Sequence, residues 1–527
     1  MSSLPVAAVL PELLAALDGA PQVLLTAPTG AGKSTWLPLQ LLAHPGINGK
    51  IILLEPRRLA ARNVAQRLAE LLNEKPGDTV GYRMRAQNCV GPNTRLEVVT
   101  EGVLTRMIQR DPELSGVGLV ILDEFHERSL QADLALALLL DVQQGLRDDL
   151  KLLIMSATLD NDRLQQMLPE APVIISEGRS FPVERRYLPL PTHQRFDEAV
   201  AVATAEMLRQ ESGSLLLFLP GVGEIQRVQE QLASRIGSDV LLCPLYGALS
   251  LNDQRKAILP APQGMRKVVL ATNIAETSLT IEGIRLVVDC AQERVARFDP
   301  CTGLTRLITQ RVSQASMTQR AGRAGRLEPG ICLHLIAKEQ AERAAAQSEP
   351  EILQSDLSGL LMELLQWGCS DPAQMSWLDQ PPAVNLQAAK RLLRMLGALD
   401  GERLSAQGQK MAALGNDPRL AAMLVSAKSD DEAATAAKIA AILEEPPRMG
   451  NSDLGVAFSR NQPAWQQRSQ QLLKRLNVRG GEADSSLIAP LLAGAYADRI
   501  ARRRGQDGRY QLANGMGAML DADDALS

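Results

Sequence analysis

The chain has 527 residues, a length that predicts roughly three or four domains. Hydrophobic residues make up 45% of the chain and charged residues 22%, as in an ordinary soluble globular protein. The formal net charge is −4, so a surface that binds nucleic acid must concentrate positive charge along a track, because the whole molecule does not attract phosphate.

The N-terminal segment has no basic region, and Pro5 and Pro11 interrupt its apolar run, which argues against a signal peptide. The densest apolar stretch, residues 134–140, is far shorter than the roughly twenty residues that span a bilayer. The six cysteines are scattered without a CxxC pair, and there are four histidines, which disfavours a zinc or redox site. We therefore expect a cytoplasmic protein with reduced thiols and no membrane contact.

Short apolar runs rich in β-branched residues alternate with helical patterns in the first part of the chain. Near-continuous hydrophobicity is typical of parallel strands that are covered on both faces. The helical candidates between these runs are residues 59–72 and 130–146, and the alternation predicts an α/β doubly wound sheet. Strands are predicted at residues 22–26, 50–56, 96–100, 118–123 and 151–156.

The pattern pauses over residues 178–195, which are rich in proline and arginine and which we interpret as an extended linker. It then restarts, so the sequence predicts a second α/β lobe. Helical patterns dominate after about residue 345, and residues 496–515 mix basic and turn residues as at the start of a β-rich unit. We expect that last unit to be truncated at Ser527. The second strand series is predicted at residues 214–221, 239–247, 267–272 and 284–289.

Residues 27–34, APTGAGKS, fit the phosphate-loop pattern except that Ala27 stands where the first glycine usually lies. They follow a predicted strand and precede a helix expected from Ser34. Backbone N–H groups of residues 30–33 would surround phosphates at the N-terminus of that helix. Lys33 would pair with the β- and γ-phosphates, and Ser34 would ligate Mg²⁺. The alternative is a glycine-rich turn of an ordinary α/β protein, which the flanking strand and helix disfavour.

Asp123 and Glu124 follow the apolar run GLVIL, at the edge of the sheet where ligands of open α/β sheets bind. Asp123 can hold Mg²⁺ through water, and Glu124 can orient and deprotonate an attacking water. An isolated Asp-Glu pair is more often part of a solvated loop. Here the neighbouring sequence HER at 126–128, and SAT at 156–158 after the next strand, favour the functional interpretation.

The run QRAGRAGR at residues 319–326 carries an arginine at every third position, so a helix would place Arg320, Arg323 and Arg326 on neighbouring rows. The arginine fork is always charged and binds phosphate oxygens bidentately. The alternative is a solvated basic helix face. Together with the other motifs, the run indicates that Gln319 positions water and that Arg323 and Arg326 stabilise transition-state charge as arginine fingers.

Taken in order, these motifs resemble those of superfamily 2 helicases, and specifically the DEAH-box (DEAH/RHA) RNA helicases. Motif II carries Phe125 in place of the usual alanine, a variant that is similar to a bacterial type of this family. The segments that resemble motifs I, Ia, Ib, II, III, IV, V and VI are residues 27–34, 56–61, 100–104, 123–129, 156–158, 216–221, 272–281 and 319–326.

The resemblance implies two tandem RecA-like lobes, a winged-helix and helical-bundle region, and the start of an oligonucleotide-binding-fold-like domain. It also implies that residues 294–312 form a β-hairpin that helps to separate strands. The aromatic residue that the family places against the nucleotide base is replaced by Ile258, so a tight clamp on the base is not expected. The expected domains are residues 1–177 and 178–345 (the lobes), 346–416 (winged helix), 417–480 (helical bundle) and 481–527 (the truncated last domain).

Residue by residue, the motifs and the resemblance give a set of expected site residues. The catalytic group is Glu124, Lys33, Gln319, Arg323 and Arg326. The ATP site is Thr29, Gly30, Ala31, Gly32, Lys33, Ser34 and Thr35, with Arg67 stacking on the base and Thr280 and Glu282 contacting the ribose. The Mg²⁺ ligands are Ser34 and Asp123, and the nucleic-acid backbone would contact Arg57, Arg58, Thr100 and Thr272.

The function expected from this set is that of an ATP-dependent RNA helicase or translocase, which couples hydrolysis of Mg-ATP to movement on single-stranded or tailed duplex RNA. Two alternatives stay open. One is a nucleotide-gated RNA-binding clamp or assembly factor with little unwinding. The other is a DNA-directed translocase, because contacts to the backbone do not reveal a preference for the 2′-OH.

Overall fold

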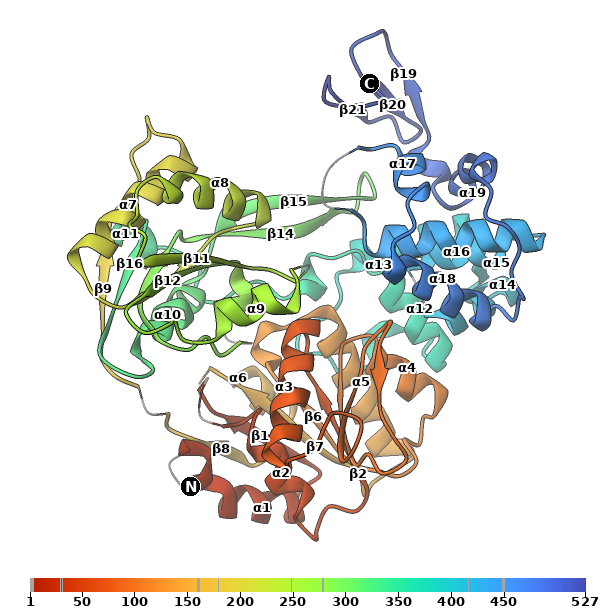
Figure 1. Ribbon diagram of the computed structural model, residues 1–527. Helices are drawn as coiled ribbons and strands as arrows, with labels where there is room; N and C mark the ends of the chain where they lie inside the picture. The colour runs from red at the N-terminus through yellow and green to blue at the C-terminus, as the bar shows by residue number, and fades with distance from the viewer. Residues whose placement is uncertain are drawn as a thin grey trace. The chain divides into compact units, whose positions relative to one another are not determined.

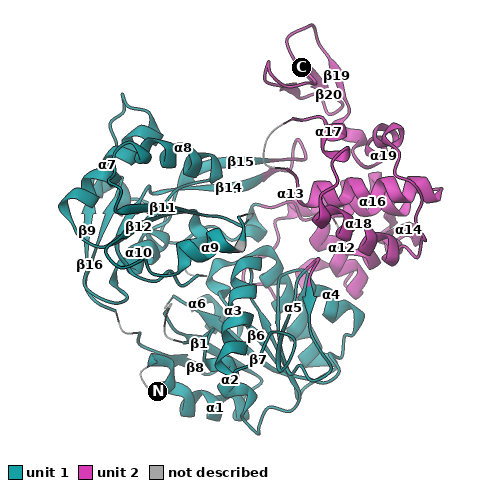
Figure 2. Cartoon of the chain, in the orientation of Figure 1, with its two compact units in different colours: residues 1–84, 88–297, 306–354 teal, residues 85–87, 298–305, 355–527 magenta. Residues whose placement is uncertain are grey.

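The computed structural model describes residues 4–28, 30, 32–158, 162–178, 180–247, 249–276, 279–415, 417–447 and 451–527. The chain divides into two compact units (Figure 2). Unit 1 comprises residues 1–84, 88–297 and 306–354, and unit 2 comprises residues 85–87, 298–305 and 355–527.

The first lobe of unit 1 is built on an eight-stranded sheet in the order β4-β3-β5-β2-β6-β7-β1-β8, in which β3 and β4 pair antiparallel and the other pairs run parallel (Figure 1). All six residues of β6 are buried, as expected for a strand covered on both faces. The strands are β1 (Gln22–Thr26), β2 (Lys50–Leu54), β3 (Val80–Arg83), β4 (Asn88–Cys89), β5 (Leu96–Val99), β6 (Val117–Leu122), β7 (Lys151–Ser156) and β8 (Val173–Ile175).

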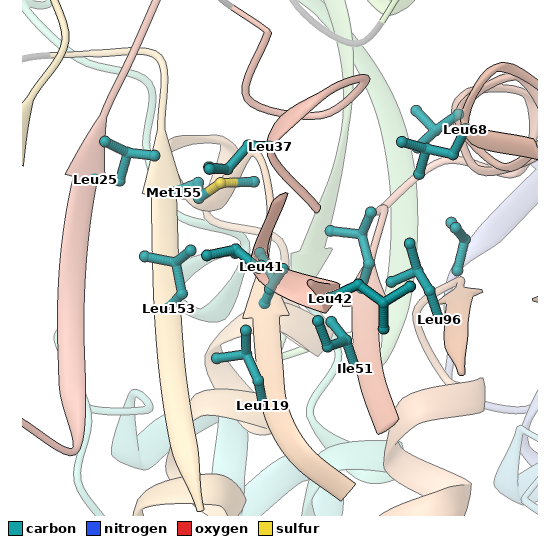
Figure 3. Packing of buried hydrophobic residues seen from close by; sticks show 14 of the residues in the cluster. Leu25, Leu37, Leu41, Leu42, Ile51, Leu68, Leu96, Leu119, Leu153 and Met155 are labelled. Atoms are coloured by element: carbon teal, nitrogen blue, oxygen red, sulfur yellow. The ribbon is translucent and has the colours of Figure 1, made fainter. Parts of the chain in front are cut away.

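One face of this sheet is covered by α1, α2 and α3. In Figure 3 the leucines of α2 lie over apolar side chains of neighbouring strands, among them Leu25, Leu119, Leu153 and Met155. The apolar side chains between α2 and the strands are thereby removed from water, which stabilises the packing of α2 on the sheet. The helices of the lobe are α1 (Leu10–Gly19), α2 (Leu37–Leu42), α3 (Arg58–Leu71), α4 (Val103–Arg110), α5 (Leu130–Gly145) and α6 (Asp162–Met167).

The second lobe has a six-stranded parallel sheet in the order β11-β12-β10-β13-β16-β9. Helices α7 and α8 cover one face of the sheet, and α9 and α10 cover the other. The strands are β9 (Val183–Tyr187), β10 (Ser214–Phe218), β11 (Val240–Leu245), β12 (Arg266–Ala271), β13 (Ile284–Asp289) and β16 (Gly330–His334), and the helices are α7 (Phe196–Gln210), α8 (Val222–Ala233), α9 (Leu251–Ile258), α10 (Gln314–Gly322) and α11 (Lys338–Glu342).

The predicted linker over residues 178–195 is wrong in part, because β9 lies within it and pairs with β16 at the edge of the second sheet. Glu184 and Arg185 of this strand are exposed. Charged side chains protect a sheet edge from unwanted pairing, and they also remove the apolar pattern by which a strand is recognised in sequence.

A two-stranded hairpin, β14 (Gln292–Asp299) and β15 (Leu304–Arg311), begins two residues before the segment 294–312 for which a hairpin is predicted and ends inside it. Its turn is closed by the Gly303 N–H, which donates to the Asp299 carbonyl at 2.8 Å. Gly303 has a φ of +71°, a conformation that glycine adopts without strain.

Unit 2 is mainly helical and ends in a small β-sheet, in agreement with the β-rich character predicted for its last part. The three strands β19–β21 form an antiparallel sheet, and β17 and β18 form a short antiparallel pair. None of the described helices has the length and apolar character needed to cross a membrane. The elements are α12 (Ser358–Trp367), α13 (Ala383–Met395), β17 (Leu399–Asp400), β18 (Arg403–Leu404), α14 (Ala406–Leu414), α15 (Pro418–Val425), α16 (Asp430–Glu444), α17 (Leu454–Phe458), α18 (Pro463–Arg475), α19 (Ile488–Ala495), β19 (Ala501–Arg503), β20 (Arg509–Leu512) and β21 (Gly517–Met519).

Candidate nucleotide-hydrolysis site

The predicted phosphate loop connects β1 to α2. Gly30 and Gly32 have φ angles of +86° and +93°, so a side chain at either position would strain the backbone. The helix begins at Leu37, not at Ser34 as predicted, because residues 33–36 form turns before it. Pro38, in the first turn of the helix, lacks an N–H that would otherwise need a partner there. Thr29 and Ala31 lie outside the described residues, and Thr35 is half-buried.

The side chains of the loop meet the carboxylates that follow β6. The Lys33 ammonium lies 2.7 Å from Glu124 Oε1 and 3.2 Å from Asp123 Oδ1. The Ser34 hydroxyl donates to Asp123 Oδ2 at 2.7 Å. Glu124 adopts a left-handed φ of +55°, and its N–H donates to Asp123 Oδ1 at 2.8 Å. The structure therefore brings together four of the predicted residues in one buried cluster.

The charged side chains of Lys33 and Asp123 shift each other's pKa values toward the ionised forms. Burial alone would lower the pKa of Lys33, but Asp123 and Glu124 outweigh it and raise the value. Burial likewise works to raise the pKa of Asp123, but the Lys33 ammonium, the Glu55 carboxyl and the Ser34 hydroxyl together lower it. Asp123 is thus ionised at neutral pH and, with Ser34, offers the oxygen donors that Mg²⁺ prefers.

Glu55 belongs to the same cluster and was not predicted. It follows β2 and is 2% exposed, and burial, followed by its contact with Asp123, raises the pKa of its carboxyl well above the usual range. The raised pKa favours the neutral form of the Glu55 carboxyl beside the charged Asp123. The available signal was its place at the end of a predicted strand, but only the neighbouring positions of β2 and β6 in the sheet bring the two carboxyls together.

His126 joins motif II to the segment after β7. The Ala157 N–H donates to His126 Nδ1 at 3.2 Å, so Nε2 carries the proton in the neutral ring. That Nε2 lies 3.4 Å from Glu124 Oε2. The SAT segment at 156–158 is therefore connected to the predicted base through one histidine.

The three arginines of the basic run lie in different surroundings. Helix α10 ends at Gly322, and a 3₁₀ helix, η4 (Arg323–Gly325), follows, so the expected single helix does not carry all three. Arg320 is fully buried, 2.8 Å from Asp289 and 2.9 Å from Glu276, and its guanidinium carbon lies 4.9 Å from the centre of the Phe218 ring. Arg320 therefore ties α10 to the end of β13 and to Glu276 within the second lobe, through its Nε and Nη1.

Arg323 and Arg326 instead turn toward the first lobe. The Arg323 Nε donates to the Glu276 carbonyl at 2.6 Å, and a Cβ placed on Gly30 would lie 3.8 Å from the Arg326 guanidinium carbon. The terminal nitrogens of both arginines, Nη1 and Nη2, are buried without a hydrogen-bond partner among the described residues. A buried cation without partners is costly, so this arrangement fits an anionic ligand.

The electrostatics agree with that interpretation. Burial, and then the repulsion from Arg326, lower the pKa of Arg323 well below its usual value. Burial also lowers the pKa of Arg326 to about 10, and Glu124 opposes the shift. Both guanidinium groups would regain their usual pKa beside phosphate oxygens. Gln319, the other predicted residue of this run, lies half-buried on α10.

The residues expected to contact base and ribose lie on separate elements. The Glu282 N–H donates to the Ile258 carbonyl at 2.9 Å, so these two residues are adjacent, and Thr280 lies exposed nearby in the chain. Arg67, on α3, is largely exposed and lies 3.8 Å from Glu70. The contacts of Arg67 with a base stay a prediction.

The predicted nucleic-acid contacts are dispersed over both lobes. The Arg57 side chain lies 3.6 Å from Glu127, and Arg58 is exposed. Thr100 is 6% exposed, and its N–H donates to the Arg83 carbonyl at 3.3 Å. Thr272 is half-buried before a 3₁₀ helix, η3 (Asn273–Ala275). Binding of nucleic acid by these residues stays a prediction.

Glu101, next to Thr100, gives a pH-dependent prediction. Burial raises the pKa of its carboxyl from the ordinary 4.5 to about 8; the Ser129 hydroxyl, which donates to it, opposes the shift, and Glu351 and Glu127 add to it. Between these pH values the folded protein binds a proton that the unfolded chain releases, so the free energy of unfolding falls as the pH rises through that window. Glu101→Gln is therefore expected to be more stable than the parent at pH 9, with the difference becoming small near pH 5. Urea unfolding of both proteins at the two pH values measures this, and a difference that is independent of pH would contradict it.

Comparison with known proteins places this geometry in a family. Residues 7–167 match the DEAD/DEAH box helicase model, and residues 198–328 match the helicase conserved C-terminal domain. The chain is 97% identical over 527 residues to the ATP-dependent RNA helicase HrpB of Escherichia coli (strain K12), covering 100% of this chain and 65% of that protein. It is 36% identical over 438 residues to the ATP-dependent RNA helicase HrpA of the same organism, covering 81% of this chain and 34% of HrpA.

Solved structures agree. A crystal structure of the Escherichia coli DEAH/RHA helicase HrpB matches with a TM-score of 0.98 at 97% identity, over 99% of this chain and 67% of that chain. A crystal structure of the E. coli DExH-box NTPase HrpB matches with a TM-score of 0.92 at 97% identity, over 100% of this chain and 65% of that chain. The chain thus spans about two thirds of the length of the HrpB relatives and about one third of the length of HrpA. The chain has two RecA-like lobes, and the motifs follow one another in order along both of them. It belongs to the DEAD/DEAH box helicase family and is of the HrpB type.

Proposed function

We propose that the protein is an ATP-dependent RNA helicase or translocase that couples hydrolysis of Mg-ATP to movement on RNA. One observation carries the proposal. The second lobe presents the buried, unpartnered guanidinium nitrogens of Arg323 and Arg326, and Arg326 lies against the phosphate loop of the first lobe. A nucleotide triphosphate supplies the negative charge that this arrangement requires.

Within the site, each residue has a role that its chemistry fits. Lys33 would exchange its carboxylate partners for the β- and γ-phosphates, and Glu124 would accept the proton of the attacking water, which Gln319 orients. Ser34 and Asp123 would hold Mg²⁺, which when bound neutralises charge on the phosphates. Arg323 and Arg326 would stabilise the charge that develops on the transferred phosphoryl group.

Hydrolysis would be coupled to the two lobes. Lys33, Asp123 and Glu124 belong to the first lobe, and the two arginine fingers belong to the second, so a bound γ-phosphate would contact both. A ligand shifts a conformational equilibrium only by its different affinity for the two states. ATP would therefore favour the closed arrangement of the lobes, and loss of the γ-phosphate would release it.

RNA is the proposed track because the relatives named above are RNA helicases, and Arg57, Arg58, Thr100 and Thr272 match backbone-contacting positions. Contacts to the backbone suit a translocating protein, since they do not hold it at one sequence. A DNA-directed translocase and an RNA-binding clamp with little unwinding are the competing functions. A strand-displacement assay with a 3′-tailed RNA duplex separates the helicase from the clamp: unwinding that requires ATP supports the helicase, whereas ATP hydrolysis without displacement supports the clamp.

The boundaries of the five domains predicted from the sequence also stay proposals. The succession α12, α13, β17–β18 and α14 supports a winged helix over residues 346–416, since a short antiparallel pair follows two helices. The three strands after residue 500 support the start of an oligonucleotide-binding fold over residues 481–527. A cytoplasmic location likewise stays a prediction.

Ile258 gives a test of nucleotide recognition. An aliphatic side chain cannot stack on the adenine ring as an aromatic side chain would, so Ile258→Phe is expected to lower the KM for ATP by about 2- to 10-fold, the range given by an aromatic pair worth about 0.5–1.5 kcal/mol. The kcat should change little, because the base contact is equal in the ground and transition states. Steady-state ATPase kinetics measure both constants. An unchanged KM would show that Ile258 does not face the base, and Ile258→Leu is the matched control.

A further inference from the structure

A buried polar network runs through the second lobe from β16 to Arg323. His334 is the last residue of β16 and Asp289 is the last residue of β13, and the parallel register places them side by side. His334 Nδ1 lies 2.7 Å from Asp289 Oδ2, and both side chains are fully buried. Neither residue belongs to a motif that the sequence identifies.

The tautomer of His334 is set by its other neighbour. The Nε of Arg185, on β9, donates to His334 Nε2 at 3.0 Å. Because Nε2 accepts a hydrogen bond, Nδ1 of the neutral ring carries the proton and donates to Asp289. The Tyr187 ring stacks on His334 with the ring centres 5.2 Å apart, which fixes the plane of the imidazole. His334 is therefore held as a directed donor to Asp289.

Asp289, which accepts from His334, also binds Arg320. Its Oδ1 accepts from Arg320 Nη1 at 2.8 Å and from the Ala291 N–H at 2.8 Å. Burial works to raise the pKa of Asp289, but Arg320 and His334 hold it at about 2, so the carboxylate stays charged. With each of its two oxygens engaged, Asp289 fixes the direction from which Arg320 approaches.

Glu276 completes the connection to the finger. Arg320 Nε donates to Glu276 Oε1 at 2.9 Å, and the carbonyl of the same residue accepts from Arg323 Nε at 2.6 Å. The side chain and the main chain of Glu276 thus join the two arginines. Since the terminal nitrogens of Arg323 have no hydrogen-bond partner among the described residues, the Nε contact is what orients its fork.

On these contacts, and resting on the proposed function, we propose that His334 and Asp289 are positioning residues that set the direction of the Arg323 finger through Arg320 and Glu276. They do not touch the nucleotide. Their contribution is expected in kcat, because a misplacement of about 1 Å in a catalytic group costs on the order of 100-fold. Nucleotide affinity, which depends mainly on the first lobe, should change little.

The test uses two substitutions of His334 that differ in one hydrogen bond. In His334→Asn the side-chain amide nitrogen occupies the position of Nδ1 and can still donate to Asp289, whereas His334→Leu loses the donor at similar volume. RNA-stimulated kcat is expected to fall by roughly 10- to 100-fold in the leucine variant and to stay within about 3-fold of the parent in the asparagine variant. The Kd of a non-hydrolysable ATP analogue is expected to stay within about 3-fold of the parent in both.

Thr204→Val is the matched control for loss of a buried polar group in the same lobe. Its hydroxyl donates to the Val200 carbonyl at 2.8 Å within α7 and does not contact the network. This variant should lose stability but keep the kcat of the parent. If His334→Leu is unfolded at the assay temperature, His334→Gln replaces it, because its amide lies one bond farther from the backbone and misses Asp289.

The outcomes separate the two proposals. A parent protein without RNA-stimulated ATPase activity overturns the proposed function itself. An active parent with parent-like kcat in the leucine variant, or with equal losses in the leucine and asparagine variants, overturns the positioning role. Equal losses of kcat in Thr204→Val and His334→Leu would assign the loss to reduced stability, and this result would also overturn the positioning role.

Discussion

Glu124→Gln is expected to abolish RNA-stimulated ATP hydrolysis while leaving nucleotide binding intact. Glutamine keeps the shape of the side chain and an oxygen that can accept from Lys33, which lies 2.7 Å away in the parent. It cannot take a proton from the attacking water. General base catalysis contributes roughly 100- to 10,000-fold, so the loss of kcat should be at least about 100-fold.

Steady-state ATPase rates with saturating RNA measure the loss, and equilibrium binding of a fluorescent ATP analogue measures what is kept. Glu113→Gln is the matched control, because Glu113 is exposed and lies outside the site. Parent-like turnover of Glu124→Gln would remove Glu124 from the role of base. Loss of nucleotide binding together with turnover would instead assign Glu124 to holding Lys33.

The second large effect is expected at the basic run. Substitution of Arg323 should lower kcat, whereas substitution of Arg320 should lower stability. Arg323→Ala is expected to lower kcat by about 1,000- to 100,000-fold, the range of arginine fingers, with a stability close to that of the parent. Arg320→Ala should instead unfold the protein readily, because it leaves the buried Asp289 and the half-buried Glu276 without their cation, at a cost of about 3–5 kcal/mol.

Thermal or urea unfolding measured beside kcat distinguishes the two arginines. Arg323→Lys tests the geometry of the fork, since lysine keeps the charge but cannot bind phosphate oxygens bidentately, and it should recover only part of the activity. Arg343→Ala, at an exposed position after α11, is the matched control. Equal stability of the Arg320 and Arg323 variants, or parent-like kcat of Arg323→Ala, would contradict this assignment.

Much of the fold follows from sequence because buried parallel strands are almost continuously apolar. Strands β1, β7 and β13 begin and end at the predicted residues. The edge strand β9 lies in a segment that the sequence predicts as a linker, because its charged residues protect the edge and interrupt the apolar pattern. The helix after the phosphate loop was placed three residues too early, since the turns before Leu37 leave no periodic signal.

The contact of Lys33 with Asp123 and Glu124 was predictable, because both segments follow strands of one parallel sheet and so meet at one edge. The place of Glu55 beside Asp123 was not, because it depends on which strands are neighbours in the sheet. The difference between Arg320 and Arg323 was also hidden. A repeat of three in the sequence makes the arginines look equivalent, but the change from α-helix to 3₁₀ helix after Gly322 separates a buried ion pair from an unpartnered fork.

The central claim is that a site completed by two lobes hydrolyses ATP in response to RNA. The most direct test is the ATPase rate of the parent protein measured without nucleic acid, with single-stranded RNA and with single-stranded DNA of the same sequence. We expect a low basal rate, strong stimulation by RNA and weaker stimulation by DNA. A rate that does not change on addition of either nucleic acid would contradict the coupling of the site to a strand, and stimulation by DNA alone would contradict the choice of RNA.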